Sequence, residues 1–372
     1  MVELAALPDH AHSFGFWTVN GEIVYSKVQS IMLAQQKNTH DIRYHYWDHV
    51  FSSYDWKAEP IQSLPELYKN RAQQLRDSYD HLVILYSGGS DSSNTLKTFL
   101  KNNIKVDEVA YWYNSYDEYN NPTNLEIIHA GSEMLHKCRD QYGITITKID
   151  ERPYYNNINL KNHEWVMHAE PSLISAQLSR SRIIYDNPQW NALTDSGLRV
   201  GIVMGLEKPR IFMDNDHWTS AFLDVLFCYN YEEFHYKQPP VTIEPFYSSP
   251  NYPLIPIKQC HVIKNYINLT YDSGFIKENF NNTAAFNREL YFKIVRNLVY
   301  PYWNDNTYTI GKGANVLNPK HSCIWNSNTD FSQKYFSGLH WLNEAVDSYF
   351  LNSGSALEGL KGCWSRGYAL DD

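Results

Sequence analysis

Hydrophobic and polar residues alternate between strand-like and helix-like patterns through the middle of the chain. Residues 82–86 form an apolar run with the length of a buried parallel strand. After a polar break, Leu96, Phe99 and Leu100 recur at helical spacing. Similar strand patterns cover residues 106–113, 144–149 and 200–204, with helical patterns at 125–142, 171–182 and 188–196 between them. Strands that alternate with helices predict an α/β fold with a doubly wound parallel sheet.

The sequence before this region has two local signals. Residues 16–19 and 22–25 flank Asn20-Gly21, a pair that is typical of a β-hairpin turn. Ser63-Leu64-Pro65-Glu66 forms a capping box for a helix that runs to about Tyr79. We therefore expect residues 1–80 to be an accessory region that contains a β-hairpin and a helix.

The sequence after residue 215 has a different character. Asp214, Asn215 and Asp216 are residue types that form turns, so we expect a turn there and no metal cluster. A stiff proline-rich stretch at 239–256 then precedes mainly helical patterns. We expect an α/β domain at residues 81–215 and a mainly helical substrate or cover region at 216–372.

Residues 87–93, with the sequence Ser-Gly-Gly-Ser-Asp-Ser-Ser, separate the first strand of the α/β domain from the helix that follows. The adjacent glycines permit positive φ, and we expect Ser90 or Asp91 to be the N-cap of the helix. Such a turn directs backbone N–H groups and the positive end of the helix dipole at one point, which suits a phosphate. The Asp91 carboxylate is a suitable ligand for Mg²⁺. A capped turn without a ligand is the alternative, but it needs neither paired glycines nor a run of hydroxyls.

The Ser-Gly-Gly-x-Asp-Ser-Ser motif resembles the PP-loop of the N-type ATP pyrophosphatases, the family of asparagine synthetase, GMP synthetase and NAD synthetase. The asparagine and tyrosine bias of this acidic chain is similar to that of asparagine-synthetase-like proteins that phages carry. The resemblance covers about residues 82–210 and implies a HUP fold, that is, an adenine nucleotide alpha hydrolase-like domain. It also implies binding of Mg-ATP, with nucleotide contacts from Ser87, Gly88, Gly89, Ser90, Ser92 and Ser93 and magnesium coordination by Asp91.

A second candidate loop follows the strand at residues 200–204. Ligands bind at the carboxyl ends of the strands in parallel sheets, so residues 205–210 are expected to face the first loop. The position also resembles the second motif of the PP-loop enzymes, which implies that Gly205 contacts the nucleotide. We expect Glu207 to be a second magnesium ligand and Lys208 to neutralise the α-phosphate. Arg210 is expected to hold an acidic group of the substrate. An ordinary solvated loop is the alternative for these charges.

Composition narrows the classes of protein to which the chain can belong. A net charge of −9 argues against a general nucleic-acid-binding surface. The chain lacks an apolar run of membrane-spanning length and a signal-peptide pattern at its start. Its five cysteines are scattered and form no CxxC pair, which fits a reducing compartment and argues against a zinc ribbon. We expect a protein of the cytoplasm, or of the host cytoplasm if a phage encodes it, with no membrane partner.

The resemblance implies an AMP-forming ligase with an amidotransferase-like reaction, which activates a carboxylate or carbonyl with ATP for C–N bond formation. In asparagine synthetase the glutaminase nucleophile is the cysteine after Met1, whereas here that residue is Val2 and no cysteine precedes Cys138. The amine must therefore come from elsewhere. Asp91, Lys208 and Arg210 are the candidate catalytic residues, ATP and Mg²⁺ the cofactors, and a small molecule the expected substrate.

Two other functions are compatible with the sequence. The domain can bind ATP or AMP without turnover, as a sensor or as an assembly or partner-binding protein, because a fold does not determine a function. It can also modify a tRNA or a nucleobase or transfer sulfur, as other PP-loop enzymes do, although the scattered cysteines give sulfur chemistry little support. Release of pyrophosphate distinguishes turnover from binding alone.

Overall fold

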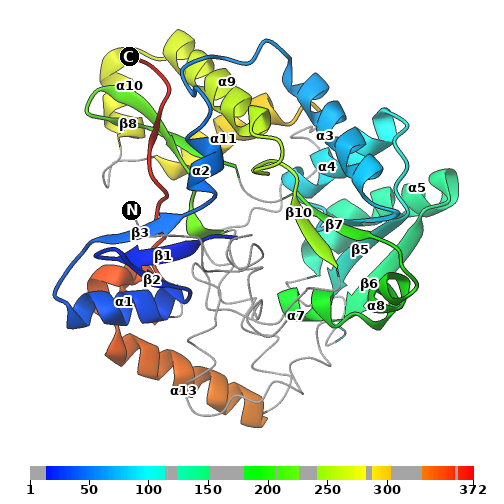
Figure 1. The fold of residues 1–372 in the computed structure, drawn as a ribbon, viewed down its shortest axis with the longest axis horizontal. Coiled ribbons are helices and arrows are strands. Elements are labelled where there is room, and N and C mark those ends of the chain that lie inside the picture. Colours follow the sequence, from blue (N-terminus) through cyan, green and yellow to red (C-terminus); the bar gives the residue numbers. More distant parts are fainter. Residues whose placement is uncertain are drawn as a thin grey trace.

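A five-stranded parallel sheet forms the centre of the fold (Figure 1). In the computed structural model, the described residues are 14–113, 115, 124–150, 180–205, 208–225, 241–281, 287–302, 329–356 and 359–372. The sheet consists of β4 (His81–Leu85), β5 (Glu108–Tyr113), β6 (Thr145–Asp150), β7 (Val200–Met204) and β10 (Thr242–Pro245), in the order β10-β7-β4-β5-β6. All four pairings are parallel. The predicted α/β class with a parallel sheet is confirmed, and the architecture is compatible with a Rossmann-like doubly wound fold.

The strand order creates one switch point in the sheet. From β4 the chain adds β5 and β6 on one side and then returns to add β7 and β10 on the other. The loops after β4 and β7 therefore leave adjacent strands in opposite directions, and Leu85 is paired with Met204 at this edge. In open parallel sheets, ligands bind at the carboxyl ends of the strands beside such a point.

Helices cover the sheet and connect its strands. The helices of this region are α3 (Leu64–Ser78), α4 (Ser90–Lys101), α5 (Ser132–Tyr142), α7 (Arg180–Tyr185), α8 (Pro188–Asp195) and α9 (Leu254–Thr270). Right-handed crossovers place α4 and α5 on the same face of the sheet. On that side α3 packs against both α4 and α9. Helix α8 packs against strand β7. The α3 capping box is confirmed, because the Ser63 N–H donates to Glu66 Oε2 at 2.8 Å.

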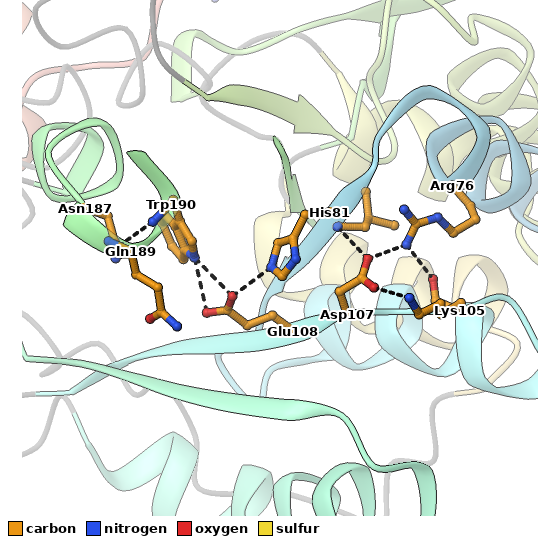
Figure 2. Close-up of polar contacts among 9 residues, drawn as sticks. Arg76, His81, Lys105, Asp107, Glu108, Asn187, Gln189 and Trp190 are labelled. Carbon is orange, nitrogen blue, oxygen red and sulfur yellow. Dashed lines mark hydrogen bonds and ion pairs between the residues drawn. The ribbon is translucent and has the colours of Figure 1, made fainter. Parts of the chain in front are cut away.

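The amino edge of the sheet is held together by buried polar groups (Figure 2). The Glu108 side chain is 1% exposed and accepts hydrogen bonds from His81 Nε2 at 3.0 Å and Trp190 Nε1 at 3.2 Å. Asp107 accepts from the backbone N–H of Leu82 at 2.9 Å and pairs with Arg76. These contacts tie β4, β5 and α8 together at the edge opposite the loops, so their role is structural.

Three features of this region differ from the sequence prediction. The fifth strand β10 lies within the proline-rich stretch predicted as a loop, where a short edge strand that ends in Pro245 has little hydrophobic pattern. The stretch predicted as one helix begins with a π-helix, η3 (Ile127–Gly131), before α5. The N-cap of α4 is Gly89, so the prediction of Ser90 or Asp91 as the N-cap is wrong. Asp91 lies in the first helical turn, where its carboxylate pairs with side chains from other elements instead of the helix N-terminus.

The N-terminal region contains the predicted hairpin. Strands β1 (Phe16–Val19) and β2 (Glu22–Val24) pair around Asn20-Gly21, and β3 (Ile42–His45) joins β1 to complete a small antiparallel sheet. Along the chain, helix α1 (Lys27–Gln36) lies between β2 and β3, and helix α2 (Asp48–Phe51) follows β3. This sheet lies on the opposite side of the molecule from the parallel sheet in Figure 1.

The C-terminal part is rich in helices but also supplies strands. Its helices are α10 (Ser273–Phe280), α11 (Arg288–Val299), α13 (Thr329–Ala345), η8 (Ser348–Phe350) and η9 (Asn352–Gly354). A third sheet, in the order β11-β9-β8, consists of β8 (Arg210–Asp214), β9 (His217–Ala221) and β11 (Tyr368–Ala369). The predicted turn at Asn215-Asp216 is confirmed, with φ of 50° and 68° between β8 and β9. The domain boundaries at 80 and 215 stay predictions, although β10 of the central sheet comes from the third predicted region.

No helix in the described parts of the chain combines the length and the apolar character needed to cross a membrane.

Candidate functional site

The glycine loop joins the carboxyl end of β4 to α4. Gly88 has a φ of +86°, and a Cβ built on it would lie 2.9 Å from the backbone oxygen of Glu126. A Cβ on Gly89 would lie 2.9 Å from Glu126 Oε1. Gly88 is therefore needed for its positive φ and for the close packing of this loop against the backbone at the start of the π-helix, whereas at Gly89 the nearest atom belongs to a flexible side chain.

The serine hydroxyls stabilise the loop conformation. Ser87 Oγ and Ser92 Oγ lie 3.1 Å apart, and Ser87 Oγ also accepts from the Gly89 N–H at 3.2 Å. Ser93 Oγ is buried and donates to Gly88 O at 3.3 Å. Within the described residues, no hydrogen bond is recorded for the backbone N–H groups of Ser90, Asp91 and Ser92. These first-turn groups are suitable donors to an anion.

The loop after β7 meets the glycine loop as the strand order requires. A Cβ on Gly205 would lie 2.6 Å from Thr95 Oγ1 and 2.7 Å from Asp91 O, so the backbone passes directly against the first turns of α4. Three residues later, Lys208 Nζ forms an ion pair with Asp91 Oδ1. The fold thus brings together Gly205, Lys208 and Asp91, although Lys208 and Asp91 are 117 residues apart in the chain.

The other two candidates in this loop have different outcomes. Glu207 lies outside the described residues, so its role as a second magnesium ligand stays a prediction. Arg210 begins β8, and its guanidinium lies against two aromatic rings, with Cζ 5.3 Å from the Phe292 centroid and 5.7 Å from the Trp364 centroid. No contact between Arg210 and residues 87–93 is recorded in the described structure. The predicted set of charged residues is therefore divided between two neighbouring places.

Two tyrosines that the sequence did not indicate complete the surroundings of Asp91. The Tyr300 hydroxyl donates to Asp91 Oδ1, and the Tyr247 hydroxyl donates to Asp91 O at 2.9 Å. Lys208 Nζ lies 5.0 Å from the Tyr300 ring centroid and 5.7 Å from that of Tyr247, which are distances for cation–π contacts. Tyr247 follows β10, so recognition of that strand would have placed it at the carboxyl edge. Tyr300 is the C-cap of α11 and has no comparable sequence signal.

Both tyrosines remain hydrogen-bond donors across the ordinary pH range. Burial and the charge of Asp91 raise the pKa of Tyr300 well above its usual value. Burial, together with Tyr68 and Asp91, has the same effect on the pKa of Tyr247. Because a neutral phenol donates a hydrogen bond to a carboxylate, Tyr300 holds Oδ1 of Asp91 in a fixed direction.

The donor set around Asp91 fits a magnesium ion that also binds substrate phosphates. The Asp91 side chain is 35% exposed, and no partner of Oδ2 is recorded among the described residues. Mg²⁺ usually takes one or two carboxylates together with phosphate oxygens and water. No group of three or more His, Cys, Asp or Glu residues that could hold a metal occurs in the described parts of the chain.

Gly205→Ala is expected to destabilise the protein by about 1–3 kcal/mol, because the new methyl would collide with backbone atoms of Asp91. Urea denaturation measures this change. Gly274→Ala is the control, since its Cβ would have Asp272 Oδ1, an atom of a flexible side chain, as its nearest neighbour at 3.2 Å. Equal stability of the two variants would contradict the close approach of the two loops.

Comparisons with known proteins do not assign this site. A scan of the sequence against protein-family models found no match, and a search of curated proteins found no similar sequence. The motif and the geometry around Asp91 are therefore the observations that indicate a function.

Proposed function

We propose that this chain is an AMP-forming, ATP-dependent ligase of the PP-loop type, with a HUP-like α/β domain. The observation that carries the proposal is the contact of Asp91, beside the glycine loop of β4, with Lys208 from the loop after β7. A phosphate-binding turn, a carboxylate for magnesium and a cation for the phosphates thus occur together at the switch point of the sheet.

Each residue has a role in this proposal. The first-turn N–H groups of α4 and the Ser87 hydroxyl bind the β- and γ-phosphates. Asp91 would coordinate Mg²⁺, with Glu207 as the predicted second ligand, and the bound ion would neutralise charge on the phosphate oxygens. Lys208 transfers its hydrogen bond from Asp91 to an oxygen of the α-phosphate. Catalysis then depends on position and on neutralised charge rather than on a covalent intermediate with the protein.

The proposed reaction has two balanced steps. A carboxylate or carbonyl oxygen of the acceptor attacks the α-phosphorus, a new P–O bond forms, and the bond to the β-phosphate oxygen breaks with release of pyrophosphate. An amine then attacks the activated carbon and loses a proton, and AMP leaves with the electron pair of the C–O bond. The products are a C–N bond, AMP and pyrophosphate.

The cysteines of the described structure favour C–N bond formation over sulfur transfer. Burial raises the pKa of Cys138 to about 11 and that of Cys260 and Cys363 to about 12. A thiolate is the reactive form in sulfur chemistry, and these three thiols remain protonated near neutral pH. Cys228 and Cys323 lie outside the described residues.

Thin-layer analysis of α-labelled Mg-ATP tests the proposal directly. The purified protein is incubated with a panel of amino acids, other small carboxylic acids, nucleosides and tRNA, and AMP and pyrophosphate are measured. Formation of both with one acceptor supports the ligase and identifies the substrate class. ADP and phosphate would contradict the reading of the loop. Tight ATP binding without turnover on any acceptor would favour a nucleotide sensor or a partner-binding protein.

Tyr300→Phe is expected to weaken Mn²⁺ binding in the presence of a non-hydrolysable ATP analogue by about tenfold or more, because ligand carboxylates depend on their hydrogen-bond partners for orientation. Electron paramagnetic resonance of free Mn²⁺ measures the affinity, with Mn²⁺ as the probe for Mg²⁺. Tyr46→Phe is the control, since it also removes a buried hydroxyl, one that donates to Ser248 O at 2.8 Å. If both variants bind Mn²⁺ equally well, Tyr300 does not orient Asp91.

A further inference from the structure

A cavity of about 200 Å³ lies where η3 and α5 meet the strands β5 and β6. Its wall is mainly apolar, because it is formed by the side chains of Tyr111, Tyr113, Ile127, Ile128, Leu135 and Ile146. Four of these residues, Tyr111, Ile128, Leu135 and Ile146, are only half-buried. The fold therefore leaves apolar surface uncovered at one concave place, which is typical of a site for a small ligand.

The two tyrosine rings in this wall are held in place by neighbouring groups. The rings of Tyr111 and Tyr113 meet edge-on, with their centroids 6.2 Å apart and their planes at 89°. Lys148 Nζ lies 3.6 Å from the Tyr113 centroid, which is a distance for a cation–π contact. Rings that are fixed before a ligand arrives lose little conformational entropy when it binds. They also favour an aromatic ligand, because pairs of aromatic rings gain energy beyond the area that they bury.

Three polar side chains of α5 line the same cavity. Ser132, His136 and Arg139 are spaced at i, i+4 and i+7, so they lie along one face of the helix. His136 and Arg139 are exposed, with the Arg139 side chain at 60%, and they therefore lie on the solvent side of the cavity. None of the described residues that line the cavity is an aspartate or a glutamate. The polar part of the lining thus suits an anion.

These polar side chains have donors that other described groups do not use. Arg139 donates from Nε to Asp140 Oδ1 at 2.7 Å and from Nη2 to His136 Nδ1 at 3.0 Å. Since an arginine can only donate, His136 Nδ1 is an acceptor, and the proton of the neutral imidazole is on Nε2. Within the described structure, no hydrogen bond is recorded for Ser132 Oγ, His136 Nε2 or Arg139 Nη1. The pair with Asp140 therefore leaves one side of the guanidinium for a second carboxylate.

We propose that this cavity binds a small aromatic carboxylate with a single ring. The ring lies against the apolar wall, and the carboxylate accepts hydrogen bonds from Arg139 and His136 on the solvent side. The volume sets the size of the ligand: an apolar cavity of about 150 Å³ holds benzene, so this cavity has room for one ring and a small substituent. The inference is independent of the proposed function, because none of the lining residues belongs to the proposed ATP site.

Fluorine NMR of the full chain tests the ligand class, with 4-fluorobenzoate as the probe and 4-fluorobenzamide as a neutral compound of similar shape. We expect the benzoate to bind at least about tenfold more tightly, because hydrogen bonds between charged partners are stronger than those to a neutral amide. Acetate, which has the carboxylate without the ring, should not displace the probe at equal concentration. Equal affinity for the two ring compounds, displacement by acetate, or no binding of the benzoate at millimolar concentration would overturn the inference.

Variants test whether the probe binds in this cavity. Leu135→Trp places a larger ring in the cavity, and Arg139→Gln removes the charge from an exposed side chain, so we expect each to weaken probe binding by about tenfold or more. Arg43→Gln is the matched control, because Arg43 is also an exposed arginine that pairs with an aspartate, Asp41 at 2.8 Å, but it does not line the cavity. We expect the control to bind the probe as the wild type does. Unchanged binding in either cavity variant, or an equal loss in the control, would overturn the inference.

Discussion

Asp91→Asn is expected to lower AMP and pyrophosphate formation by at least about 10²–10³-fold, the size of effect that follows loss of one electrostatic contact in an active site. Asparagine has nearly the same shape and can still accept the Tyr300 hydrogen bond, so the tyrosine contact survives. The variant lacks the negative charge that binds magnesium and pairs with Lys208. The expected loss therefore concerns the chemistry and not the fold.

Product analysis with labelled ATP and thermal denaturation measure these two properties separately. Asp80→Asn is a matched control, because Asp80 is also an aspartate in an ion pair, with Arg199 at 3.0 Å, but is on the surface. We expect the control to keep its turnover. Full turnover of Asp91→Asn would remove the main support for the proposed site, whereas loss of turnover together with unfolding would show that Asp91 is structural.

The elements that sequence patterns predicted well are those with strong local signals. The strand at residues 200–204 is fully buried and continuously apolar, and the structure has β7 at Val200–Met204. The capping box at Ser63 and the turn at Asn20-Gly21 also depend on neighbours in the chain. By contrast, β10 is defined by its pairing with β7, and that pairing becomes visible when the fold is known.

The same distinction applies to the site. Asp91, Gly205 and Lys208 were predicted to lie together because the carboxyl ends of parallel strands meet at one edge of the sheet. This topological rule links residues that no local sequence signal connects. No such rule indicated Tyr300, whose contact with Asp91 depends on how α11 packs against the sheet domain. The C-terminal helical region thus contributes Tyr300 to the site, and its sequence pattern does not predict this contact.

Lys27→Met is expected to destabilise the protein by about 3–5 kcal/mol, because it leaves a buried carboxylate without its counter-charge. Lys27 Nζ lies 2.7 Å from Asp224 Oδ2, and the two side chains are 1% and 0% exposed. The same ammonium donates to the Lys361 backbone oxygen, and Trp17 Nε1 donates to Asp224 Oδ2 at 3.3 Å. This pair fastens the N-terminal sheet to the segment that carries Trp364.

Urea denaturation measures the change, and Lys37→Met is the surface control. Lys37 pairs with Glu22, but these side chains are 35% and 56% exposed, so the expected cost is about 1 kcal/mol or less. A similar loss in both variants would show that burial of the Lys27 pair has no special energetic effect.

A double variant separates the energy of the ion pair from the cost of an isolated charge. Lys27→Met combined with Asp224→Leu removes both buried charges and keeps the apolar volume, so we expect most of the lost stability to return. If stability returns, the isolated buried charge accounts for most of the cost of the single substitution. If stability does not return, the hydrogen bonds from Trp17 and to Lys361, rather than the opposed charges, hold the three segments together.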